Sequence, residues 1–152
     1  MVKRLLLVVA GVLFLSTTAY ATEPEESDNP YRFIEITDEE ADLLNRITAA
    51  EAQTQNMPGR RAVVEVILNR VISPDWPNTV KGVLSQPGQF SSWKHRYDSW
   101  VVPELGCDAV NEILSIGPME LPNTDYVFFS RGRSKYATDY IKIQDHWFGR
   151  RK

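Results

Sequence analysis

The segment from Arg60 to Ile72 carries apolar residues on most sides of a helical pattern, and this limits the possible folds more than any other feature of the chain. Alanine, valine, leucine and isoleucine recur at the three- and four-residue intervals of one helix face and also on the faces between. A helix that is apolar nearly all round is buried rather than spread over a surface. We therefore predict a central helix that ends at Ser73-Pro74, with the other elements packed around it.

A second helix is predicted upstream of the central one. Thr37 and Glu40 have the spacing of a capping box, in which each side chain accepts a backbone N–H of the other residue. Apolar residues then recur at helical spacing at Ala41, Leu44, Ile47 and Ala50. Glu51 follows this pattern and falls on or beside the apolar stripe, where an ordinary surface helix would carry a hydrophobic residue.

The rest of the chain changes from helical to strand patterns. Short and medium helices are predicted at 79–84 and 103–115, with an amide- and hydroxyl-rich loop at 86–93 between them. The segments 126–129 and 140–143 are rich in aromatic and β-branched residues, which is typical of paired strands. We expect an α+β fold in which helices are followed by a small antiparallel sheet of two or three strands near the C-terminus.

The start of the chain indicates export. Residues 1–21 have a basic start, an apolar run of 11 residues and a final Ala-Tyr-Ala, the pattern of a cleaved signal peptide. The run is too short for the roughly 20 residues that span a bilayer, so no stable membrane insertion is expected after cleavage. We expect a secreted or periplasmic protein with a flexible, acidic lead-in at 22–36 and one domain at 37–152.

Composition excludes several classes of function. Without residues 1–21 the chain has 15 basic and 20 acidic residues, a net charge of −5, which argues against nucleic acid as a partner. The basic end, Arg150 to Lys152, is read as a solvated terminus. Cys107 is the only cysteine, so no disulfide forms within the chain and no thiolate metal cluster is available. The two histidines, His95 and His146, are far apart in sequence, and we expect neither a metal nor a cofactor.

Glu51 is the residue best placed for chemistry. Burial on the apolar side of a helix favours the neutral carboxyl, the form in which a general acid can protonate a leaving oxygen. The alternative is a glutamate at the helix edge that reaches water or pairs with Arg60 or Arg61. The aromatic residues around His95, which are Trp93, Tyr97 and Trp100, either form a wall on which sugars stack or complete the core.

Several separated motifs occur together from residue 44 to residue 148. They are Glu51-Ala52, Gly59 eight residues after Glu51, Val66-Ile67-Leu68-Asn69-Arg70-Val71, Trp76-Pro77-Asn78-Thr79-Val80, Gln86-Pro87-Gly88-Gln89-Phe90-Ser91, Tyr126-Val127-Phe128-Phe129 and Ile143-Gln144-Asp145-His146-Trp147-Phe148. In this order they resemble the SleB/CwlJ-type cell wall hydrolases. The resemblance implies a lysozyme-like domain that cleaves peptidoglycan, and it places the family's catalytic glutamate on Glu51. It also implies a substrate cleft lined by Asn69, Gln86, Gln89, Phe90, Ser91, Tyr126 and His146.

One departure from the family pattern affects the expected mechanism. Gln55 stands where a second glutamate is common, and an amide cannot act as a base. A single glutamate suits a lytic transglycosylase, which needs no second carboxylate, whereas ordinary hydrolysis needs two. Asp98, Glu104 and Asp139 remain candidates for a second carboxylate and therefore for muramidase-type hydrolysis. The third alternative is a catalytically silent protein that binds peptidoglycan. The protein is expected to act as a monomer.

Overall fold

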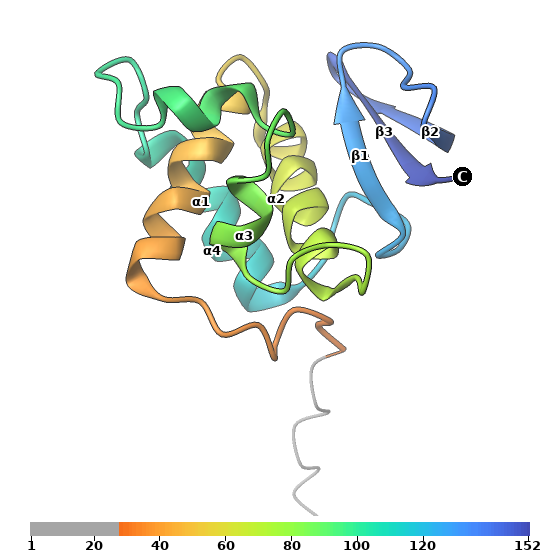
Figure 1. The fold of residues 1–152 in the computed structure, drawn as a ribbon, viewed down its shortest axis with the longest axis horizontal. Coiled ribbons are helices and arrows are strands. Elements are labelled where there is room, and N and C mark those ends of the chain that lie inside the picture. The colour runs from red at the N-terminus through yellow and green to blue at the C-terminus, as the bar shows by residue number, and fades with distance from the viewer. Residues whose placement is uncertain (1–27) are drawn as a thin grey trace, which may run out of the picture.

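The computed structural model describes residues 28–152, and the predicted signal peptide lies outside them. Its elements are α1 (Asp38–Glu51), α2 (Met57–Ile72), α3 (Val80–Leu84), the 3-10 helix η1 (Ser91–His95), α4 (Glu104–Ile116), β1 (Tyr126–Ser130), β2 (Ala137–Ile143) and β3 (His146–Arg151). The helices gather on one side and the sheet on the other, with the C-terminus at the outer part of the sheet (Figure 1). Within residues 28–152, no helix has the length and apolar character needed to cross a bilayer.

Helix α2 is the central helix that the sequence predicts. Every residue from Ala62 to Val71 is buried, and α1, α3, α4 and β1 all pack against α2. The helix begins three residues earlier than expected, because Asn56 caps it by accepting from the N–H of Gly59. Pro58 lies in the first turn, where its missing N–H costs nothing, so this proline starts the helix instead of belonging to a loop.

Helix α1 begins at the predicted capping box. The Thr37 hydroxyl accepts from the N–H of Glu40, and the Glu40 carboxylate accepts from the N–H of Thr37. Helices α1 and α4 cross closely at Gly106, where an added Cβ would lie inside contact distance of the backbone oxygen of Asn45. The middle of α1 is thereby held against α4.

The sheet confirms the α+β class. Its three antiparallel strands lie in the order β1-β3-β2, so the last strand of the chain is the central one. His146 and Phe148 of β3 are buried, whereas Trp147 between them lies on the opposite face. Arg150 and Arg151, expected in a solvated terminus, belong to β3 and pair with β1 and β2.

The lead-in differs from its prediction over residues 28–36. Tyr31 is only 2% exposed, belongs to the hydrophobic core and donates its hydroxyl hydrogen to the Oδ1 of Asn69 over 2.7 Å. Asn29 is also buried, and its amide donates to the backbone oxygen of Leu114. Isolated buried side chains of this kind leave no repeating pattern in the sequence. A short polar segment is therefore predicted to be flexible although its side chains are packed.

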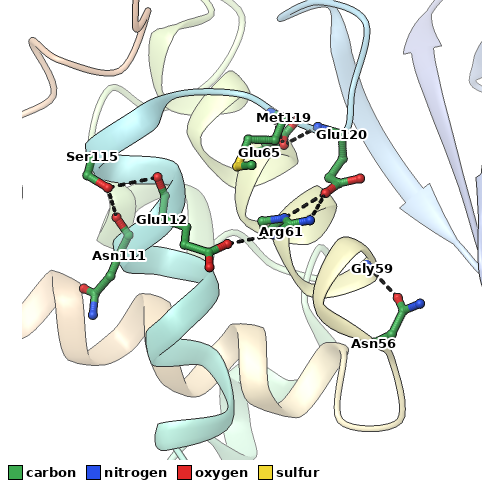
Figure 2. Close-up of polar contacts among 9 residues, drawn as sticks. All are labelled: Asn56, Gly59, Arg61, Glu65, Asn111, Glu112, Ser115, Met119 and Glu120. Atoms are coloured by element: carbon green, nitrogen blue, oxygen red, sulfur yellow. Dashed lines mark hydrogen bonds and ion pairs between the residues drawn. The ribbon is translucent and has the colours of Figure 1, made fainter.

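A fully buried carboxylate connects α2 to the segment that leads into the sheet. Glu65 accepts backbone N–H bonds of 2.8 Å from Met119 and Glu120, which are drawn in Figure 2, and a third of the same length from Leu121. Burial raises the pKa of Glu65, and the three N–H groups act in the opposite direction. Arg61, one turn earlier on α2, bridges Glu112 of α4 and Glu120.

Candidate active site

Glu51 is the last residue of α1 and lies half-buried at the mouth of a pocket. Its Oε1 accepts two hydrogen bonds from Ser92, one from the hydroxyl over 2.6 Å and one from the backbone N–H over 3.2 Å. Both donors bind the same oxygen, so a proton on the Glu51 carboxyl belongs on Oε2. Ser92 therefore fixes which oxygen of Glu51 can act as the acid.

The pocket beside Glu51 has a volume of about 330 Å³ and is open to solvent. It is lined by Ala50, Glu51, Ser91, Ser92, Lys94, His95 and Trp100. One oxygen of Asp98, Oδ2, accepts from His95 Nδ1 over 2.8 Å and from Trp100 Nε1 over 3.3 Å. Asp98 thus orients two flat rings that form one wall of the pocket.

His146 of β3 is buried among aromatic side chains of the sheet. Its ring packs against Phe129 at 5.5 Å and Phe148 at 6.2 Å between centroids. Burial lowers the pKa of His146, the charge of Arg131 lowers it further, and the charge of Glu51 acts in the opposite direction. His146, which was expected in the substrate cleft, does not line the pocket of Glu51.

The loop after Glu51 is fastened to the turn between β2 and β3. The Gln55 amide donates to the Asp145 carboxylate and accepts from the Asp145 backbone N–H, each over 3.3 Å. The N–H of Asn56 donates to the side-chain oxygen of Gln144 over 2.6 Å. Gln55 is buried, and a glutamate in its place would face the Asp145 carboxylate. The glutamine that departs from the family pattern is thus suited to its neighbour in this chain.

The structure brings together only part of the predicted substrate cleft. Ser91 lines the Glu51 pocket and also a neighbouring hollow that contains Gln86. Phe90 is buried and packs against Phe129 beneath the loop. Gln89 points into a different hollow, formed with Trp76, Phe128 and the C-terminal residues.

Asn69 and Tyr126 lie away from Glu51, in the core. Asn69 is 1% exposed, accepts from the Tyr31 hydroxyl and donates to the backbone oxygen of Tyr126 over 2.9 Å. Tyr126 is 5% exposed and pairs with Arg150 between β1 and β3. These contacts give Asn69 and Tyr126 a place in the scaffold that holds the sheet on α2, and neither lines the pocket of Glu51.

The comparisons with known proteins agree with this architecture. The model of the cell wall hydrolase family matches residues 54–149. The chain belongs to the cell wall hydrolase family. The match begins three residues after Glu51, so the role of Glu51 rests on the geometry of its pocket and on the sequence resemblance. No curated protein matches the sequence significantly.

Two solved structures share the fold. The catalytic domain of the Bacillus cereus SleB protein is 24% identical, with a TM-score of 0.65, over 80% of this chain and 98% of that one. The catalytic domain of the germination-specific lytic transglycosylase SleB from Bacillus anthracis is 25% identical, with a TM-score of 0.63, over 75% of this chain and 96% of that one. The lysozyme-like α+β fold predicted from the sequence is thereby confirmed.

Sequence reasoning missed Ser92, which makes the direct contacts to Glu51. The signal was present as two adjacent hydroxyls, Ser91 and Ser92, but their order on the 3-10 helix decides which one turns toward Glu51. Of the two arginines considered as partners for Glu51, Arg61 pairs with Glu112 and Glu120 instead, and within residues 28–152 no ion pair joins Arg60 to Glu51. Of the aromatic residues near His95, Trp93 packs on the core while Trp100, 44% exposed, lines the pocket.

Across residues 28–152, no cluster of three or more histidine, cysteine, aspartate or glutamate side chains is placed to hold a metal ion. Cys107 is a free, half-buried cysteine on α4.

Proposed function

We propose that this protein cleaves the glycan strands of peptidoglycan between N-acetylmuramic acid and N-acetylglucosamine, with Glu51 as the general acid. The observation that carries the proposal is the pocket at the end of α1, where Ser92 holds one oxygen of Glu51 and leaves the other available. Membership of the cell wall hydrolase family supports peptidoglycan as the substrate. The SleB relative from Bacillus anthracis is described as a lytic transglycosylase, and we propose the same reaction here.

In this reaction, Oε2 of Glu51 gives its proton to the glycosidic oxygen as the bond to C1 of N-acetylmuramic acid breaks. The oxocarbenium-like sugar is then attacked by its own C6 hydroxyl, whose proton returns to Glu51. The products are a 1,6-anhydro-muramic end and a free hydroxyl on the departing N-acetylglucosamine. One carboxyl serves as acid and then as base, so no second carboxylate is required.

The pocket wall supplies binding groups for a sugar. Trp100 offers a flat apolar face, and aromatic faces of this kind pack on sugar rings. His95 is held by Asp98 through Nδ1, which leaves Nε2 for a hydrogen bond to substrate. Ser91 also lines the pocket and offers a hydroxyl. These residues would hold the muramic acid while Glu51 acts on its C1 oxygen.

Hydrolysis of the muramidase type is the second candidate, because one further carboxylate does lie beside the pocket. Asp98 contacts two residues of the pocket wall, whereas Glu104 begins α4 and Asp139 pairs with Arg150. A water molecule activated near Asp98 would give reducing muramic ends in place of anhydro ends. The candidate depends on Asp98 giving up its present role of orienting His95 and Trp100.

The substrate requires an extracytoplasmic site of action. Peptidoglycan lies outside the cytoplasmic membrane, which agrees with the signal peptide predicted at residues 1–21. We therefore propose that the protein is exported and acts in the cell wall.

The test is mass spectrometry of purified peptidoglycan digested with the protein lacking residues 1–21, beside a Glu51→Gln variant. We expect 1,6-anhydro-muramic ends from the wild type and none from Glu51→Gln. Reducing muramic ends would replace the transglycosylase with the hydrolase. If both proteins sediment with peptidoglycan and neither releases fragments, the enzymatic proposal is wrong and a wall-binding role remains.

A further inference from the structure

The charge of the protein is divided between its two parts. Residues 130–152, which contain β2, β3 and the loop before them, have seven lysines and arginines against two aspartates, a net charge of +5. Residues 28–129, which contain the helices and most of β1, have eight basic against fifteen acidic residues, a net charge of −7. The net charge of the whole chain is therefore negative although the segment that contains β2 and β3 is positive.

Four residues form an aromatic and cationic cluster on the outer face of this sheet. The guanidinium carbon of Arg133 lies 4.4 Å from the ring centre of Trp147 and 5.6 Å from that of Tyr140. The ammonium of Lys142 lies 5.5 Å from the ring centre of Trp147, and the two aromatic rings meet edge to face at 6.4 Å. We call Arg133, Tyr140, Lys142 and Trp147 the outer cluster.

The register of the sheet explains why these side chains share one face. Lys142 of β2 lies opposite Trp147 of β3, and side chains alternate between the two faces of a strand. The neighbours of Trp147, His146 and Phe148, turn inward to the core. Gly149 leaves room for the Tyr140 ring, which lies in the space that a Cβ would need.

The basic charges of this face are largely uncompensated. Within residues 28–152, no ion pair involves Arg133 or Lys142 of the outer cluster, nor Arg131 or Lys135 of the loop before β2, whereas Arg150 pairs with Asp139 and Arg151 with Asp75. Unpaired like charges on one surface create a positive potential, and this potential attracts an anionic partner. The cluster also presents ring edges and faces, which suit a partner that contains sugars.

The loop between β1 and β2 carries two of these arginines. Arg131 follows β1 directly, and its charge adds to the effect of burial in lowering the pKa of His146, a buried residue of β3. Arg133 is two residues further along the same loop and belongs to the outer cluster. A polymer that contacts the sheet would therefore meet positive charge from this loop as well as from Lys142 of β2.

We propose that the outer cluster binds peptidoglycan through the carboxylates of its stem peptides, as a second contact with the wall outside the Glu51 pocket. The inference rests on peptidoglycan being the substrate. Arg133 and Lys142 would pair with carboxylates while Trp147 and Tyr140 pack on the glycan. Stem peptides repeat along each strand, so a face with several cations can bind more than one of them at once.

Sedimentation of the catalytically disabled Glu51→Gln protein with insoluble peptidoglycan tests this inference, because binding is then measured without cleavage. The test variant adds Arg133→Gln and Lys142→Gln, and the control adds Arg32→Gln and Lys81→Gln, two charges removed from the helical part. We expect the test variant to bind roughly tenfold more weakly, which corresponds to about 1.4 kcal/mol, and the control to bind as Glu51→Gln does. Thermal melting of each variant checks that the fold is intact.

Chemically modified walls identify the ligand. When the carboxylates of the peptidoglycan are converted to amides, the difference between test and control variants should disappear, and raising the salt concentration should reduce it. The difference should persist on walls from which phosphate-containing polymers have been removed. Equal binding of the two variants to untreated peptidoglycan overturns the inference, and so does a difference that is lost only with the phosphate polymers.

These outcomes are separable from those of the proposed function. Failure of the wild-type protein to release fragments concerns Glu51 and its pocket, and it is measured by mass spectrometry. Loss of binding in the outer-cluster variant is measured with Glu51 already replaced. Either result can therefore stand without the other.

Discussion

Replacing Ser92 with alanine tests the arrangement that defines the candidate active site. The change removes the hydroxyl that donates to Oε1 of Glu51 over 2.6 Å and leaves the backbone N–H bond of 3.2 Å in place. Oε1 is then only partly engaged, and the proton of Glu51 can sit on either oxygen. We expect the acid to be correctly oriented for a smaller fraction of the time, so the rate of bond cleavage falls.

The size of the effect follows from the strength of the lost bond. A hydrogen bond to a charged group contributes about 1.5–3 kcal/mol, and short hydroxyl–carboxylate bonds belong to the stronger ones. Glu51 is half-exposed, so water can replace part of what is lost. A loss of about 1 to 2 kcal/mol from the transition state corresponds to a roughly five- to thirtyfold decrease in kcat.

Initial rates on solubilised glycan strands measure this effect, with two variants for comparison. Ser92→Thr keeps the hydroxyl and should recover most of the activity. Ser91→Ala removes a hydroxyl that lines the pocket without contacting Glu51, so it should alter KM more than kcat. If Ser92→Ala retains kcat within about twofold of the wild type while Glu51→Gln is inactive, the hydroxyl does not position the proton and the reasoning is wrong.

Two further predictions concern the scaffold. Glu65→Gln should lower the free energy of unfolding by roughly 3 kcal/mol, because one of three buried N–H groups would face an amide nitrogen. The control is Glu112→Gln, at a half-exposed ion pair, which should lower the free energy of unfolding by less than about 1 kcal/mol. Both values are measured by the same denaturant titration. Gly106→Ala should lower the free energy of unfolding by about 1–3 kcal/mol, because the new Cβ would meet the backbone oxygen of Asn45. The control is Gly132→Ala, whose Cβ would have no neighbouring atom within 4 Å and which should change the free energy of unfolding by less than about 0.5 kcal/mol. A melting temperature unchanged by Gly106→Ala would mean that α1 and α4 separate easily.

Patterns repeated along the chain predicted most of the fold. The apolar faces of α2 and the capping box of α1 are local signals, and both helices form where these signals indicate. Tyr31 shows the limit of this approach, because one buried aromatic residue in a polar segment leaves no periodic trace. The third strand was also difficult to predict, because His146 to Arg151 contains a glycine and two arginines, and pairing on both sides overrides these weak local preferences.

The sequence predicts which residues belong to family motifs better than it predicts where their side chains lie. Glu51 and the loop that contacts it lie together, but Asn69 and Tyr126 are enclosed in the core. The motif around Asn69 has a structural reason to exist, since this side chain connects Tyr31 to the first strand. A sequence motif cannot distinguish a residue that contacts substrate from one that holds the scaffold.

The position of Glu51 at the end of α1 links the chemistry to the sheet. The chain leaves the helix at Glu51, and four residues later Gln55 is bound on both sides of its amide by Asp145, in the turn between β2 and β3. The end of α1 and the turn between β2 and β3 are therefore joined through one short loop and one buried amide. A glutamate in the middle of α1 would lie several residues from this junction. The place of Glu51 in the proposed reaction thus depends on contacts made by the sheet as well as on the helix that carries it.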